Sequence, residues 1–182
     1  MTVSALRDRP ETLESGLSTL AAEIGAACEL PFPLMAERIK SALARAAADP
    51  DILAPEHRRP QPGSYARHVI HADPAGRFTI LALVWSPGQF SPPHAHHTWC
   101  GYAVCDRPLT ETLFRWDRSS SHAAPVRTEV RNPGYSCFAG EGLDQIHRLG
   151  NSGHGPAISI HVYGVERERI ATHVNRMVDV AP

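Results

Sequence analysis

The sequence predicts a mainly β fold that carries a helical segment at its N-terminal end. The first 50 residues show the apolar spacing of helices, whereas the chain from residue 65 onward consists of short β-rich runs separated by Gly/Pro turns. Many short strands with such turns are typical of a sandwich or small barrel. We therefore expect a helical cap over residues 1–50 and a β-barrel over residues 65–182, both in one domain of 182 residues.

Two helices are expected in the cap. The first follows Pro10 and Thr12, which suit a helix start, and its apolar positions recur at helical spacing. These positions are Leu13, Leu17, Leu20, Ala21 and Ile24. The second helix runs from about Leu34 to Ala48 and ends before Pro50, because the residue that precedes a proline disfavours helical geometry. The proline-rich stretch 54–63 is expected to be a loop.

Eight β-rich runs are expected after the loop. Turn signals such as Asp73-Pro74-Ala75-Gly76 and Asn132-Pro133-Gly134 separate them. The runs cover residues 65–71, 77–86, 98–105, 109–116, 125–131, 135–139, 157–164 and 173–180.

Composition excludes several classes of function. The formal net charge of −1 gives no electrostatic case for binding nucleic acid or an anionic membrane. Apolar runs such as 80–85 are too short to span a bilayer, and the charged stretch Arg7-Asp8-Arg9 interrupts any signal-peptide core. The cysteines show no CxxC spacing, which fits a reducing cytosol. We expect a cytoplasmic protein, monomeric or a small homo-oligomer, with no nucleic-acid or membrane partner.

Three histidines form a candidate metal site. His94 and His96 lie two residues apart on an extended segment, so both imidazoles point to the same side. His147 follows 51 residues after His96 and can supply a third nitrogen. A three-histidine site leaves open coordination positions, which are typical of catalysis. The alternative is a pair of exposed strand histidines; His97 should face the opposite side and is left out.

The spacing around these histidines resembles the metal motifs of the cupin superfamily. Gly88, five residues, then His94-Ala95-His96 matches the first motif, and His147, three residues, then Asn151 matches the end of the second. Cys100 stands where the usual cupin carries a glutamate ligand. Three neutral imidazoles then leave a divalent ion its full charge, which favours a thiolate ligand. The resemblance implies a cupin-type β-barrel, that is, a jelly-roll-like double-stranded β-helix.

Within the cupins, the chain resembles cysteine dioxygenase and its thiol dioxygenase relatives over roughly residues 65–164. The matching motifs are Tyr65-Ala66-Arg67, Cys100 eleven residues before Glu111, His147-Arg148, and Ser159-Ile160-His161-Val162-Tyr163. The resemblance implies Fe(II) held by His94, His96 and His147. It also implies that both atoms of O2 are added to the sulfur of a small carboxylate-bearing thiol, above all L-cysteine, to give a sulfinate.

Ser159, His161 and Tyr163 alternate along one face of a predicted strand. Three buried polar groups in a row are costly unless they hydrogen-bond to one another, so we expect a relay from the serine through the histidine to the phenol. The resemblance implies a catalytic role for all three, and a possible thioether cross-link between Cys100 and Tyr163. An exposed edge-strand face, or His161 as a fourth metal ligand, are the alternatives.

Arg67 and Tyr65 share one face of the first strand and are expected to bind the substrate; the alternative for Arg67 is a solvent-facing arginine. A guanidinium pairs with a carboxylate through two parallel hydrogen bonds. In the family, arginine here is typical of the cysteine-oxidising branch, whereas the 3-mercaptopropionate branch carries glutamine. The stretch 166–169 offers further arginines, so 3-mercaptopropionate or mercaptosuccinate stays open as the substrate. Trp85, Trp99 and Trp116 are expected to pack in the interior, and Trp99 lies close enough to the ligands in sequence to shape the pocket.

Two other classes of function remain. Three histidines also suit Zn²⁺, as in a zinc-dependent cupin hydrolase or isomerase. A cupin that only binds a small molecule is the other alternative. The predicted relay favours an enzyme, because a binding module has no need of it.

Overall fold

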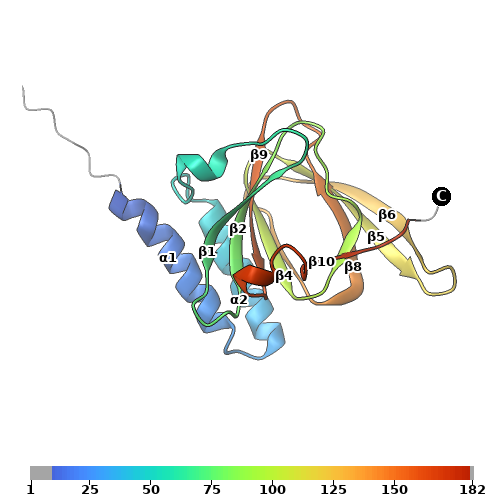
Figure 1. The fold of residues 1–182 in the computed structure, drawn as a ribbon, viewed down its shortest axis with the longest axis horizontal. Coiled ribbons are helices and arrows are strands. Elements are labelled where there is room, and N and C mark those ends of the chain that lie inside the picture. Colours follow the sequence, from blue (N-terminus) through green and yellow to red (C-terminus); the bar gives the residue numbers. More distant parts are fainter. Residues whose placement is uncertain (1–9, 181–182) are drawn as a thin grey trace, which may run out of the picture.

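Two five-stranded antiparallel sheets face each other, and two helices cover the outer side of the first (Figure 1). The computed structural model describes residues 10–180, with side chains from residue 16 onward, so Leu13 and the stretch 7–9 lie outside the described side chains. The helices are α1 (Pro10–Ala27) and α2 (Phe32–Ala47), and the short 3-10 helices are η1 (Pro55–Arg58) and η2 (Arg167–Arg169). No helix within residues 10–180 has the length and apolarity needed to cross a bilayer.

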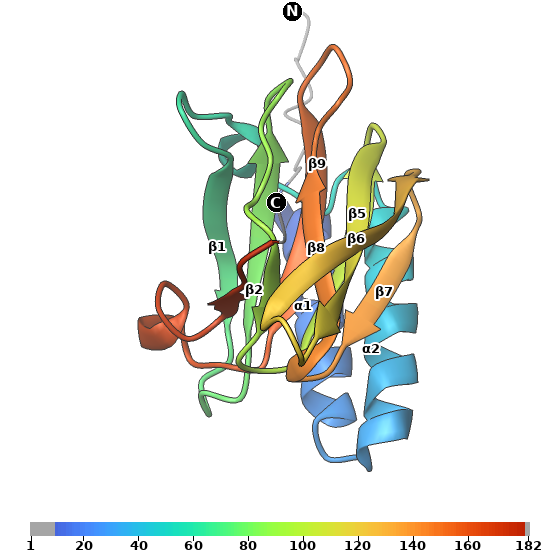
Figure 2. The same cartoon turned by 90° about the vertical axis from the view of Figure 1, so that its right-hand side faces the viewer.

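The first sheet has the strand order β1-β2-β9-β4-β7 and the second the order β10-β3-β8-β5-β6. Figure 2 shows the strands of the two layers from the side, with the helices behind them. The strands of the first sheet are β1 (Ala66–Ala72), β2 (Thr79–Trp85), β9 (Ala157–Tyr163), β4 (Cys100–Asp106) and β7 (Ser136–Ala139). Those of the second are β10 (Asn175–Met177), β3 (His94–His96), β8 (Gly142–Gly150), β5 (Leu109–Asp117) and β6 (His122–Arg131).

The inner strands β2 and β9 of the first sheet are buried on both faces. All residues of β2 and β9 are buried, which explains why 80–85 reads as a continuous apolar run. One face packs against the helices and includes Ile80 and Ile160, whereas the other faces the second sheet and includes Leu83 and Tyr163. The interior between the two sheets is therefore a separate compartment from the helix-covered core.

Helix α2 packs closely on the first sheet because β4 carries Gly101 where a larger residue would not fit. A Cβ at this position would lie 2.9 Å from Cδ1 of Leu43 and 3.2 Å from the backbone oxygen of Cys137. Leu43 and Ile39 are completely buried beneath the helix. Their burial is the main reason that the helical segment stays attached to the sheet.

The predicted mainly β, cupin-type fold with a helical N-terminal segment is confirmed. No ladder in residues 10–180 joins the two sheets, so they form a jelly-roll sandwich without a hydrogen-bonded closed barrel. The prediction missed β8, whose sequence lacks regular alternation, and it missed η1 within the expected loop. The expected strand over 173–180 pairs as a ladder only at Asn175–Met177.

We predict that Leu43→Ala lowers the free energy of unfolding by roughly 3 kcal/mol, because it leaves a cavity between α2 and β4. Leu34→Ala on the same helix is the matched control, since Leu34 is 58% exposed and its truncation should cost less than about 0.5 kcal/mol. Urea unfolding followed by circular dichroism measures both values. Equal losses in the two variants would contradict the packing described.

Candidate metal centre

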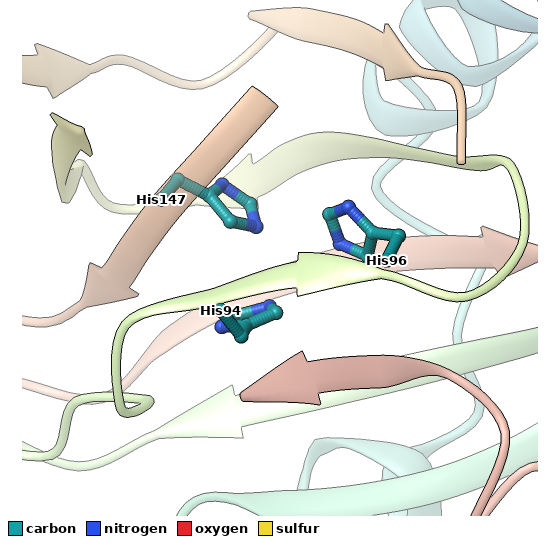
Figure 3. A group of neighbouring side chains, drawn as sticks. All are labelled: His94, His96 and His147. Carbon is teal, nitrogen blue, oxygen red and sulfur yellow. The ribbon is translucent and has the colours of Figure 1, made fainter. Parts of the chain in front are cut away.

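Three buried histidines converge from two neighbouring strands of the second sheet. His94 and His96 lie on β3 and His147 lies on β8, directly opposite His94 in the antiparallel register. Their candidate ligand nitrogens all lie within 4.8 Å of one another. Figure 3 shows the three rings grouped around one point. The structure therefore brings together the three histidines selected from the sequence.

Hydrogen bonds set the tautomers of two of the rings. Nδ1 of His94 lies 2.8 Å from the carbonyl oxygen of Pro92, and Nδ1 of His147 lies 2.7 Å from Oε1 of Glu111. A carbonyl and a carboxylate only accept hydrogen bonds, so each Nδ1 carries the proton. Nε2 of each ring is left with a free lone pair for a metal ion.

In His96, the nitrogen available to a metal ion is Nδ1, not Nε2 as in the other two histidines. Nε2 lies 3.2 Å from Sγ of Cys100, whereas Nδ1 is buried and has no hydrogen-bond partner among the described residues. A buried polar atom without a partner is costly, and binding a metal ion would remove that cost. The unpartnered nitrogen, together with the two free lone pairs, fits a divalent metal ion held by three histidines.

The rings of His94 and His96 are neutral and need not lose a proton before they bind a metal. Burial, reinforced by the neighbouring His147, lowers the pKa of His94 to about 3 and that of His96 to about 2. Metal binding competes with protons for the same nitrogens. At neutral pH this competition is therefore absent at both positions.

Glu111 on β5 is a functional candidate that the sequence analysis quoted only within a motif. Its carboxylate is 3% exposed and bonds to His147 through Oε1 and to Nε of Arg131, at 2.7 Å, through Oε2. Arg131 also pairs with Glu129 and lies over the ring of Tyr135. Burial raises the pKa of Glu111, but the hydrogen bonds from His147 and Arg131 outweigh it and leave the pKa below its usual value.

A carboxylate therefore stands one hydrogen bond beyond the three histidines. Such a partner fixes the orientation of a metal-binding imidazole and raises its basicity. The negative charge of Glu111 also balances part of the charge of a divalent ion. The sequence analysis had assigned this charge balance to the substrate thiolate alone. The sequence did contain a signal for this residue. Glu111 lies two residues after the fully buried Leu109 on the same strand, so its side chain points to the same, interior face.

Ser159, His161 and Tyr163 form one hydrogen-bonded row on β9. Oγ of Ser159 lies 2.8 Å from Nε2 of His161, whose Nδ1 lies 3.2 Å from the Tyr163 hydroxyl. Strand β9 lies between β2 and β4, so the row is not on an exposed edge. Both nitrogens of His161 have partners, which leaves none for a fourth metal ligand.

Trp85 on β2 determines which atom donates in each hydrogen bond of the row. Its indole Nε1, which can only donate, donates to Oγ of Ser159 at 3.0 Å. The Ser159 hydroxyl can then donate to Nε2 of His161, which is neutral because burial holds its pKa well below the usual value. Nδ1 of His161 donates in turn to Tyr163, whose own proton is left for the pocket. Burial raises the pKa of Tyr163, so the phenol keeps that proton.

Trp99 packs as expected, but it does not line the pocket, and Trp85 is the tryptophan that does. Trp85 lines the pocket, whereas Trp99 stacks on Phe138 at 5.6 Å between ring centroids and packs against the helix-covered core. Trp99 directly precedes Cys100, which faces the interior, and successive side chains along an extended chain point to opposite faces. Proximity in sequence to the histidines was therefore misleading.

All of the predicted catalytic, binding and metal-ligand residues line one cavity between the sheets, with the exception of Ser159, which lies behind His161. Tyr65 stacks on Trp85 with 4.2 Å between ring centroids, and Nη2 of Arg67 donates to the carbonyl oxygen of Ile170 at 3.1 Å. Arg67 is the only arginine among the described residues that lines this cavity. Cys100 lies directly opposite Tyr163 in the pairing of β4 with β9.

We predict that Glu111→Gln weakens metal binding about 10- to 100-fold, because a neutral amide holds the His147 ring less firmly and adds no negative charge. Competition with a chelator measures the affinity. Glu129→Gln is the control, since Glu129 also pairs with Arg131 but does not contact a histidine. Unchanged affinity in Glu111→Gln would show that the carboxylate does not support the site.

Comparison with known proteins identifies the family. The family model for cysteine dioxygenase type I matches residues 58–175. One similar solved structure is a Thermus thermophilus protein, with 18% identity, coverage of 60% of this chain and 91% of that chain, and a TM-score of 0.48. Another is a Klebsiella pneumoniae protein with a double-stranded β-helix domain, with 21% identity, coverage of 62% of this chain and 86% of that chain, and a TM-score of 0.46. A third is recombinant oxalate oxidase in complex with glycolate, with 18% identity, coverage of 58% of this chain and 53% of that chain, and a TM-score of 0.45. These structural similarities are too weak to indicate an activity. The family match covers more than half of the chain and all three histidines, and the chain therefore belongs to the cysteine dioxygenase type I family.

Proposed function

We propose that the protein is a non-haem Fe(II) dioxygenase that converts L-cysteine to cysteine sulfinate. The observation that carries this proposal is the convergence of three histidine nitrogens in a cavity that also holds Arg67 and the Tyr163 phenol. Family membership supports the reaction class, since the family is that of cysteine dioxygenase type I. The cavity groups supply what a small thiol with a carboxylate requires.

The three histidines would hold the iron through neutral nitrogens. No carboxylate among the described residues joins them as a ligand, since Glu111 is already bonded to His147 and Arg131. When bound, Fe(II) would bring a thiolate and dioxygen together and activate them toward each other. Cys100, whose Sγ lies 3.2 Å from Nε2 of His96, is shorter than the glutamate ligand of the usual cupin and adds no carboxylate to the site.

Arg67 would bind the substrate carboxylate. Its hydrogen bond to Ile170 orients the guanidinium and uses only one nitrogen, so the remaining N–H groups are available for two parallel bonds. Tyr65 stands beside it on the same strand face, and burial raises the pKa of its phenol, which therefore remains a donor. A carboxylate held here fixes the distance at which the thiol enters the cavity.

Tyr163 would direct its proton toward the reacting atoms. The row from Trp85 through Ser159 and His161 leaves the phenol hydrogen uncommitted. A phenol in a cavity that excludes bulk water can stabilise developing negative charge on oxygen or sulfur by hydrogen bonding. The relay thus positions a donor without changing its own protonation state.

We predict that iron-loaded protein consumes oxygen and forms a sulfinate fastest with L-cysteine. The same assay with 3-mercaptopropionate and mercaptosuccinate ranks the competing substrates. Arg67→Gln should raise the KM for L-cysteine by roughly tenfold or more, since a charge-assisted carboxylate contact is lost. Arg169→Gln, outside the cavity, is the control. Absence of sulfinate with all three thiols would refute the proposed function.

Tyr163→Phe should lower kcat about 100-fold with little effect on KM, because the phenol proton acts in the reaction and not in binding. Peptide mass spectrometry of the same proteins tests the proposed Cys100–Tyr163 thioether, which joins two peptides with the loss of two hydrogens. The linked species should be present in the wild type and absent from the variant. Tyr135→Phe is the control and should retain both kcat and the link.

A further inference from the structure

Asn175 on β10 belongs to the cavity but was not selected from the sequence. It pairs with His96 in the antiparallel ladder of β10 with β3, so both side chains lie on the same face. The amide lines the metal cavity, is half-buried, and has no hydrogen-bond partner among the described residues. A polar group in this position is available to a ligand.

Asn175 and Arg67 approach the cavity from two different sheets. Strand β1 is the edge of the first sheet and β10 is the edge of the second, and no ladder within residues 10–180 joins the two edges. The segment between η2 and β10 reaches back to β1 through the bond from Arg67 to Ile170. The two side chains therefore line the same opening, which we call the β1–β10 seam, defined by Arg67 and Asn175.

Several polar groups in and behind the deeper part of the cavity already have partners, whereas the buried hydroxyl of Tyr102 has none among the described residues. Ser91 accepts a hydrogen bond from the Leu149 amide, and Ser159, His161 and Tyr163 are bonded to one another. At the seam, the uncommitted groups are the Tyr65 phenol, the remaining N–H groups of Arg67, and the Asn175 amide. One cation with two neutral donors is a set that suits a single carboxylate.

We propose that Asn175 is a specificity-determining residue, whose Nδ2 donates a hydrogen bond to the substrate carboxylate that Arg67 holds. The inference rests on the proposed function and deepens it, because it assigns the carboxylate two anchors from opposite sheets. One carboxylate oxygen faces the guanidinium and the other faces the amide. A bound carboxylate consequently ties β1 to β10 across the seam, where no ladder pairs these two described strands.

The test uses iron-loaded protein kept free of oxygen, with propionate as a thiol-free probe. Hydrogen exchange at residues 175–177 and isothermal calorimetry are measured with and without propionate. Propionate should slow exchange in β10 of the wild type, whereas Asn175→Leu should bind it roughly tenfold more weakly and show no slowing. Arg176→Gln is the matched control, because Arg176 pairs with Ala95 and lies on the opposite face of the same strand.

A second variant tests whether residue 175 donates to the substrate carboxylate or accepts from the substrate ammonium group. Asn175→Asp puts a negative charge beside the substrate carboxylate, so the KM for L-cysteine should rise more than tenfold while kcat changes little. An unchanged KM would mean that position 175 does not contact the carboxylate, and a lower KM would mean that it accepts from the substrate ammonium group. Either result would overturn the proposal. Unchanged propionate binding and KM in Asn175→Leu would also overturn it.

The two proposals fail in different ways. If propionate binding depends on Asn175 but no thiol yields a sulfinate, the carboxylate anchor stands and the proposed activity falls. If a sulfinate forms while Asn175→Leu and Asn175→Asp match the wild type in KM and in propionate binding, the activity stands and the anchor falls.

Discussion

The hydrogen bond between His147 and Glu111 is the constraint on which the metal centre depends. It joins β8 to β5, fixes which nitrogen of His147 is free, and places a carboxylate in direct contact with the three-histidine group. The carboxylate is stable in the interior because Arg131 balances its charge from β6. Burying an unpaired carboxylate would be costly, so the three side chains must be present together.

The two sheets contribute different chemistry to the interior. The second sheet presents the histidines and their acidic support, whereas the first presents the row that ends at Tyr163. Each sheet needs only the alternation of its own strands to point these groups inward. The helices then bury the opposite face of the first sheet and hold that sheet against the cavity (Figure 1).

The sequence predicted those parts of the site that depend on local alternation. His94 with His96, and Ser159 with His161 and Tyr163, share a face because they are two residues apart. The partners of these residues could not be predicted, since Glu111, Trp85 and Asn175 meet them only through cross-strand register. Register depends on the whole sheet, and because strand β8 was missed, its two ladders, with β3 and with β5, could not be considered.

The β1–β10 seam involves the edge strands of the two sheets, whereas Tyr163 lies on a central strand of the first sheet. Side chains at the seam lie on edge strands, so changing them breaks no buried ladder and leaves the histidines, Glu111 and the Tyr163 row intact. Substrate choice and chemistry can consequently change independently during evolution. Under the proposed function, a protein of this architecture can acquire a different thiol by exchanging one or two residues at the seam, while the interior with the histidines is inherited without alteration.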